Sequence, residues 1–210
     1  MIFKYFPFVF CLLFFLNLNA QNFGGGGKLG ISTSQVGGDN LAGFHKTGAL
    51  IGIFANKSIS ELMSFQMEMT FAQKGSNNPE MNNYENENYL KPDISSSYIE
   101  LPFLLQYHQN EDLKIEFGLL AAYLIDAYYN DINGKIPLSN NQINPFIDYD
   151  FGILLGIDYK FSTKFTLNTR LSNSIKPIGS EDYINNTNFN SSRKGKYNSV
   201  LSFAIHYNLS

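Results

Sequence analysis

Apolar and polar residues alternate with a period of two along several long segments of this 210-residue sequence. The clearest segment spans residues 164–174, where Phe165, Leu167 and Leu171 share one parity. The opposite parity holds only polar or charged side chains, among them Arg170. Side chains of a β-strand point in turn to the two faces of a sheet, so this segment predicts a strand with one apolar and one polar face.

The same pattern predicts a series of long strands. Most of them reach the roughly 9 to 11 residues that a tilted strand needs to cross a bilayer. Some carry aromatic residues at both ends of an aliphatic middle, as Tyr149 and Phe161 do, and aromatic rings suit the two membrane interfaces. The predicted strands are 27–35, 46–56, 59–74, 94–108, 113–125, 149–161, 164–174 and 197–209.

Short and long connections alternate between these strands. The short ones are 56–58, 109–112 and 161–163. The long ones, which are rich in Asn, Ser and Gly, are 36–44, 76–93, 127–147 and 178–195. Bacterial outer-membrane barrels have short periplasmic turns and long external loops. The sequence therefore predicts an all-β fold, an eight-stranded antiparallel up-and-down transmembrane β-barrel in the cell outer membrane.

The N-terminal segment has a different composition from the rest. Lys4 precedes an apolar stretch from Tyr5 to Leu16, and Ala20 ends the segment on a small residue. The apolar stretch is shorter than the roughly 20 residues of a membrane-spanning helix, and its flanks are those of a secretory signal. We therefore expect a cleavable signal peptide at residues 1–20 and one barrel domain at residues 21–210.

Charge and composition narrow the classes of function. The formal net charge is −3 and the pI is near 5.6, so we expect no basic surface for nucleic acid. Cys11 is the one cysteine and would leave with the signal peptide. His45, His108 and His206 lie in or beside different predicted strands, without the spacing of metal ligands. We therefore expect neither a nucleic-acid partner nor a metal or cofactor.

The polar faces of the predicted strands carry many charges. If they line the lumen, the enclosed charged residues are Lys28, Glu68, Lys74, Glu100, Glu116, Asp150, Asp158, Lys160, Lys164 and Arg170. Paired carboxylates can act as acid and base, but a barrel of this size is just wide enough for side chains to fill it, and buried charges must pair. We therefore expect a structural polar network and no open pore. Its predicted members are Glu68, Glu100, Glu116, Asp150 and Arg170.

A soluble barrel of the lipocalin kind is the alternative fold. Its apolar side chains would point inwards to a ligand, and its strands would need no terminal aromatic residues. The breadth of the apolar face and the charge on the opposite face favour the membrane barrel. A soluble periplasmic binder stays open as an alternative.

Several short motifs are spread over nearly all of the chain after the signal peptide. They are Gly27-Lys28-Leu29-Gly30-Ile31, Phe71-Ala72-Gln73-Lys74-Gly75, Gly118 with Tyr123-Leu124, and Asp150-Phe151-Gly152 with Gly156. The most specific is Tyr98-Ile99-Glu100-Leu101-Pro102. Together they resemble the PorT-like family of outer-membrane β-barrel domains. The resemblance implies an outer-membrane barrel and, because a member of that family is associated with protein secretion, an accessory role in a secretion complex.

These observations predict an integral outer-membrane protein that acts as a scaffold or as a binding or assembly component. We expect no enzymatic activity, since the sequence carries no local nucleophile motif such as Gly-x-Ser-x-Gly. The expected partners are outer-membrane lipid, the barrel assembly machinery, and a secretion-complex or periplasmic protein. The secretion role stays an alternative because a shared fold does not transfer a function.

Overall fold

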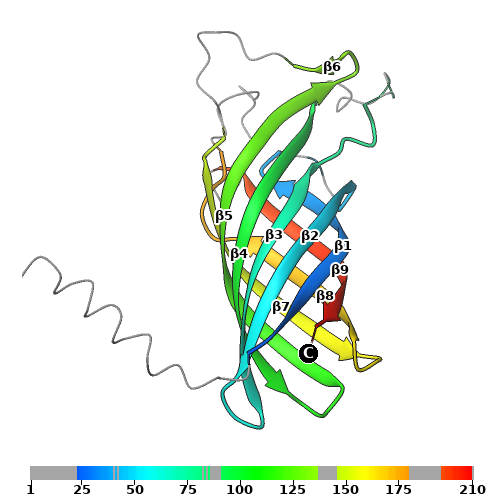
Figure 1. The fold of residues 1–210 in the computed structure, drawn as a ribbon. Helices are drawn as coiled ribbons and strands as arrows, with labels where there is room; N and C mark the ends of the chain where they lie inside the picture. Colours follow the sequence, from blue (N-terminus) through cyan, green and yellow to red (C-terminus); the bar gives the residue numbers. More distant parts are fainter. Residues whose placement is uncertain are drawn as a thin grey trace, which may run out of the picture.

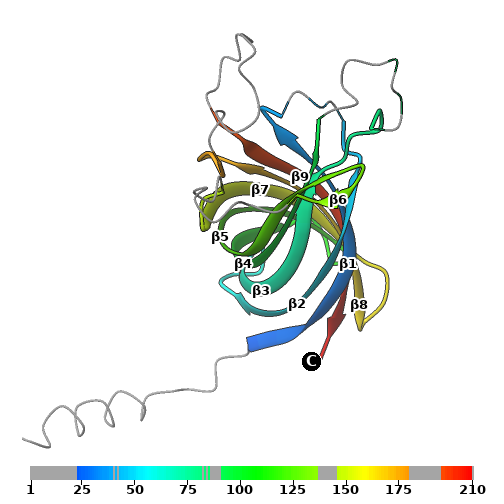
Figure 2. The same ribbon diagram turned by 90° about the horizontal axis from the view of Figure 1, so that it is seen from above.

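The computed structural model describes residues 23–39, 41, 43–81, 83, 85, 91–136, 146–179 and 195–209. Within these residues, eight long strands form one antiparallel sheet that the pairing of β4 with β5 closes into a barrel (Figures 1 and 2). They are β1 (Phe23–Gly37), β2 (Lys46–Ser58), β3 (Met63–Ser76), β4 (Asp93–His108), β5 (Leu113–Asp131), β7 (Tyr149–Lys160), β8 (Phe165–Ser174) and β9 (Tyr197–Asn208). The predicted eight-stranded fold is confirmed.

Each strand pairs with its neighbours in chain order, and β1 also pairs with β9. Gly30, for example, lies opposite Leu50 on β2 and Ala204 on β9. The short connections lie at one end of the barrel, at the bottom of Figure 1, together with the start of β1 and the end of β9. Such turns are periplasmic in bacterial outer-membrane barrels, so the opposite end, with the long connections, is external.

The apolar side chains of each strand are exposed and the polar ones are buried, which is the reverse of the arrangement in a soluble protein. On β7, Leu155 and Ile157 are 56% and 52% exposed, whereas Asp150 and Asp158 are 1% and 2% exposed. The apolar face therefore points outwards, and the polar face lines the lumen. A lipocalin-like soluble barrel would need the opposite arrangement, so that alternative does not fit the structure.

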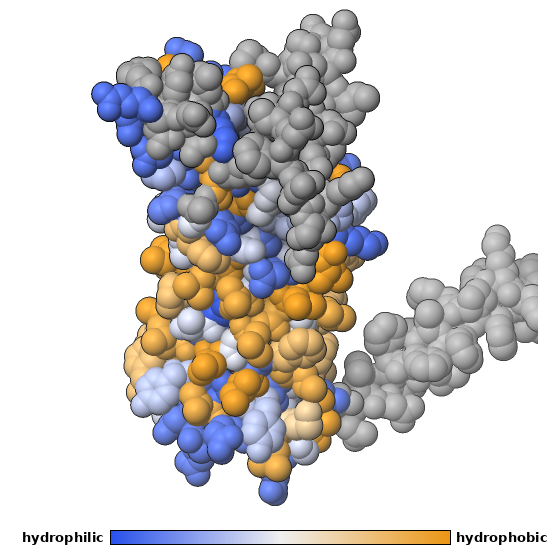
Figure 3. Space-filling model, turned by 180° about the vertical axis from the view of Figure 1, so that it is seen from behind, coloured by the Kyte–Doolittle hydropathy of each residue, from blue (hydrophilic) through white to orange (hydrophobic). Residues whose placement is uncertain are grey.

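The outward side chains form a hydrophobic belt. Figure 3 shows this belt on one face of the barrel, with hydrophilic residues at the short-turn rim and again towards the long connections. Aromatic rings meet near both edges of the belt. Tyr123 and Tyr149 contact each other towards the external end with centroids 5.5 Å apart, and Phe165 and Tyr207 at the short-turn end with centroids 5.4 Å apart. Such a belt with aromatic borders matches the hydrocarbon layer of a membrane.

The strand β5 is longer than the sequence predicted. It continues past residue 125 to Asp131 and turns into the short strand β6 (Gly134–Lys135). Its last residues lie on the external side of the hydrophobic belt. There Tyr129 packs against Phe146, with ring centroids 5.1 Å apart. Inward aromatic packing thus extends the strand into what the sequence pattern indicated to be a loop.

Some of the predicted features fall outside the described residues. The expected signal peptide at 1–20 lies wholly outside them, and the expected loops at 36–44, 76–93, 127–147 and 178–195 lie partly outside. Among the described residues, no helix has the length and apolar character needed to cross a membrane.

Candidate functional site

The five residues of the predicted network all lie in the lumen. They are Glu68 on β3, Glu100 on β4, Glu116 on β5, Asp150 on β7 and Arg170 on β8. None of these residues is more than 7% exposed. They belong to two clusters at different heights in the barrel, which we call the basal cluster, near the short turns, and the distal cluster, near the long connections.

Arg170 is the centre of the basal cluster. Its Nη1 and Nη2 donate to the two carboxylate oxygens of Glu68 at 3.1 and 3.0 Å, and its Nε donates to Oε1 of Glu116 at 2.7 Å. In the ring of strands, β8 and β3 are four positions apart in either direction, so they face each other across the barrel. The ion pair of Arg170 with Glu68 therefore bridges the full width of the lumen.

A second cation and a set of amides complete the basal cluster. Lys28 Nζ donates to Glu68 Oε2 at 2.6 Å. Asp158 has amide partners, because Gln106 Nε2 and Asn168 Nδ2 donate to its two oxygens at 3.0 and 2.6 Å. Asn168 Nδ2 also reaches Glu116 at 2.8 Å. Neutral amides of this kind carry no charge signal in the sequence, which is why sequence reasoning did not include them.

The distal cluster is built around Lys74. Its ammonium forms ion pairs with Glu100 and, at 3.6 Å, with Asp150. The same ammonium lies over the ring of Tyr98, 4.9 Å from the centroid. Asn198 Nδ2 donates to Asp150 Oδ2 at 3.0 Å. One cation thus serves two carboxylates, and a tyrosine and an asparagine complete the layer.

Apolar side chains separate and cover the two clusters. Leu104, Leu120 and Leu154 form a buried layer between them. A larger apolar cap fills the external end of the lumen; it comprises Val36, Ile94, Tyr98, Ala122, Leu124, Tyr129, Phe146 and Ile178. The described lumen is therefore packed by the basal cluster, the leucine layer, the distal cluster and the apolar cap, and Tyr98 belongs to both of the last two.

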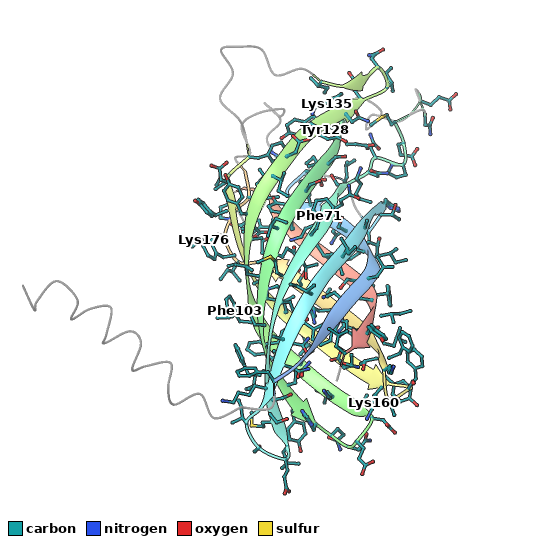
Figure 4. All side chains as sticks on the ribbon, viewed as in Figure 1. Phe71, Phe103, Tyr128, Lys135, Lys160 and Lys176 are labelled. Carbon is teal, nitrogen blue, oxygen red and sulfur yellow. The ribbon has the colours of Figure 1, made fainter. Side chains whose placement is uncertain are left out.

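Two lysines of the predicted lumen face lie elsewhere. Lys164 precedes β8 and is exposed, and Lys160 is the last residue of β7 at the short-turn rim (Figure 4). The parity of the sequence pattern assigned both to the lumen, but the wall ends at these positions. Their ammonium groups reach water at the rim, so the prediction was wrong for these two residues.

One serine–histidine contact occurs near the short-turn rim. Ser64 Oγ lies 2.8 Å from His108 Nε2 and also donates to Gln106 Oε1 at 3.0 Å. A catalytic triad needs an acid that orients the imidazole, but the strand partner of His108 is Lys114. Among the described residues, no group of three His, Cys, Asp or Glu side chains is placed to hold a metal ion. The chemistry of the lumen is therefore pairing of charges and amides.

Comparisons with known proteins agree with this architecture. A search of the curated proteins found no match. The attachment invasion locus protein Ail of Yersinia pestis, in complex with the heparin analogue sucrose octasulfate, aligns with a TM-score of 0.51 and 9% identity over 89% of this chain and 99% of that chain. Neisserial surface protein A aligns with a TM-score of 0.49 and 12% identity over 88% of this chain and 96% of that chain. At such identity, the likeness to Ail concerns the fold alone.

The family comparison is more specific. Residues 19–179 match the model of a family described as the outer membrane protein beta-barrel domain. The matched part runs through β1 to β8 and includes both clusters of the lumen except for the residues of β9. The chain therefore belongs to the outer membrane protein β-barrel domain family, and it is a protein of the outer membrane.

Proposed function

We propose that this protein is a non-catalytic outer-membrane scaffold with a closed lumen, which binds or assembles partners at the two ends of its barrel. The observation that carries the proposal is the ion pair of Arg170 with Glu68 across the full width of the lumen, together with the bond from the same guanidinium to Glu116 two strands away. A pore would have to separate these buried charges. Leaving a buried charge without its partner costs about 3–5 kcal/mol, so the closed arrangement is favoured.

The same pairing supports a role without catalysis. General acids, bases and nucleophiles act on a substrate that reaches them, whereas Glu68 and Glu116 are saturated by donors of the protein itself. Both carboxylates are 2% exposed or less. The lumen charges are therefore proposed to hold the wall together, which is the structural role that the sequence pattern indicates.

Export and assembly follow from the location. A chain that reaches the outer membrane must first cross the inner membrane, so we propose that residues 1–20 act as the signal peptide and are removed after Ala20. Outer-membrane lipid around the belt and the barrel assembly machinery are the proposed partners. The mass of the mature protein tests the cleavage site, since uncleaved chain would keep Cys11.

The motif that most specifically resembles the PorT-like family has a structural explanation. Tyr98, Glu100 and Pro102 lie on β4 and are all buried on the lumen side. Tyr98 and Glu100 contact Lys74 there. The motif thus supports a shared way of packing the lumen and does not favour a secretion role. Co-purification of the tagged protein with a stable envelope complex would favour that role instead.

Ion conductance tests the closed scaffold. The protein is refolded into planar bilayers, and insertion is verified by the mobility of the unboiled protein on a gel. We expect no steady conductance above that of the bare bilayer, because packed side chains fill the lumen. A stable, reproducible conductance level of the wild-type protein would contradict the proposal.

A further inference from the structure

The barrel wall has a window between β8 and β9 near the external end. The ladder between these strands stops at the pair Asn173 and Ser199. The chains meet again further up, where Ile178 N–H donates to the carbonyl of Lys196 at 2.8 Å. A cavity of about 590 Å³ lies at this gap. It is lined by Ile153, Asn173, Ser174, Ile175, Tyr197, Asn198 and Ser199.

The window has a cause in the sequence. Between the two points of contact, residues 174–177 on the β8 side face only residues 197 and 198 on the β9 side. The longer side stays paired with β7, since Ile175 N–H donates at 2.7 Å to the carbonyl of Phe151, its partner in the β7–β8 register. Pro177 has no amide hydrogen with which to continue the ladder. The regular ladder is therefore interrupted here, and across the gap Asn198 N–H donates to Ser174 Oγ at 3.2 Å instead.

The inner side of the window presents an unsatisfied acceptor. Asn198 is 1% exposed and lines the cavity. Its Nδ2 is used by Asp150, but its Oδ1 has no hydrogen-bond partner. A buried polar atom of this kind favours a bound group that donates a hydrogen bond.

The outer side of the window is apolar. Ile153 and Ile175 are 41% and 56% exposed on the membrane face. The Nζ of Lys176 lies 5.2 Å from the centroid of the Phe151 ring, outside the wall (Figure 4). A lysine over an aromatic ring at the end of the apolar belt is typical of the membrane interface. The window is thus placed at the border between the acyl chains and the headgroups of the outer leaflet.

We propose that this window binds an amphiphile that enters sideways from the membrane, with its acyl chain against Ile153 and Ile175 and its headgroup at Asn198. The headgroup donates a hydrogen bond to Asn198 Oδ1, the acceptor without a partner.

The sequence offers a clean probe, because it contains no tryptophan. Ile175→Trp places one indole at the window, and Leu155→Trp places one on the lipid face of β7 as the matched control. Both variants are reconstituted in phosphocholine nanodiscs. Indole fluorescence is then titrated with an alkyl glucoside and with an alkyl phosphocholine that carry the same brominated chain, since bromine quenches indole on contact.

The expected result is saturable quenching of Ile175→Trp by the glucoside, with a midpoint about tenfold or more below that of the phosphocholine, whose headgroup has no hydrogen-bond donor. The control is expected to show equal, non-saturating quenching by both probes. Adding Asn198→Leu to Ile175→Trp should remove the preference for the glucoside. Asn198→Ala serves as a second, milder variant, with the same expected loss of preference, should Asn198→Leu fail to fold.

Two outcomes would overturn the proposal. One is equal midpoints for the two probes at Ile175→Trp, which would mean that only the acyl chain is bound. The other is quenching without saturation, which would mean simple partition into the bilayer. Because the indole itself can fill the window, the wild-type protein is also measured, and its unfolding midpoint is expected to rise with glucoside but not with phosphocholine. These results do not depend on the conductance, so the two proposals fail separately.

Discussion

At the scale of single residues, the lumen is held by charges that have no access to water. Glu68 accepts hydrogen bonds from two cations of different strands, Lys28 and Arg170. The buried carboxylate is stable in the interior only because the two cations are present, and the cations are stable there only because the carboxylate is present. The sequence could predict which charges face inwards from their parity. It could not predict the partners, because pairing across the ring depends on strand register.

Removal of the central cation should destabilise the barrel strongly. Arg170→Met leaves Glu116 without its cation, so we expect a loss of about 3–5 kcal/mol in the free energy of unfolding. Denaturant unfolding in lipid vesicles measures this loss. Lys135→Met is the matched control, since Lys135 pairs with Asp126 at 3.7 Å while both side chains are more than half exposed. That control should change stability by about 1 kcal/mol at most. Equal losses for the two variants would contradict the role of Arg170.

Gly156 lies beside the basal cluster, and its substitution should also destabilise the barrel. A Cβ atom at Gly156 would lie 2.5 Å from Oε1 of Glu116, the oxygen that accepts from Arg170 Nε. Gly156→Ala should therefore displace the carboxylate and lower the unfolding midpoint. Gly27→Ala is the control, because the nearest atom to its Cβ would be a backbone oxygen at 3.9 Å. Unfolding in vesicles compares them, and a Gly156→Ala variant as stable as Gly27→Ala would count against a tightly packed basal cluster.

At the scale of elements, the strands follow the alternation of the sequence closely. The predicted strand 94–108 is observed as Asp93–His108, and 164–174 as Phe165–Ser174. Period-two patterning decides both the strand and its faces, so both could be predicted from the sequence. The extension of β5 to Asp131 could not be predicted, because it depends on packing of Tyr129 against the distant Phe146. The window between β8 and β9 was missed because it depends on the register in which these two strands pair.

A charge on the outward face tests the membrane belt. Leu155 lies in the middle of β7, between the exposed aromatic residues Phe151 and Tyr159. Leu155→Arg should cost about 2–4 kcal/mol in the free energy of folding into vesicles, because the guanidinium is placed in hydrocarbon. Ile59→Arg is the control, since Ile59 is 63% exposed just after β2, in the short turn to β3. A similar folding yield for both variants would argue against the assigned bilayer position.

At the scale of the whole molecule, closure of the sheet removes the free strand edges except at the rims and at the window between β8 and β9. In a barrel, all ladder hydrogen bonds are made between neighbouring strands, so the backbone can cross a bilayer without unsatisfied groups. The lumen bridges add contacts across the ring, between strands that do not touch along the wall. Together they explain why a chain with its apolar face outwards can be stable.

The most direct test of a closed outer-membrane barrel is heat modifiability. Outer membranes of cells that express the protein are solubilised in detergent, and gel mobility is compared with and without boiling. The account predicts faster migration of the unboiled protein, since the ring of strands and its buried ion pairs resist detergent, and migration near the full mass after boiling. Equal mobility in both lanes, with the protein in the soluble periplasmic fraction, would contradict the membrane barrel.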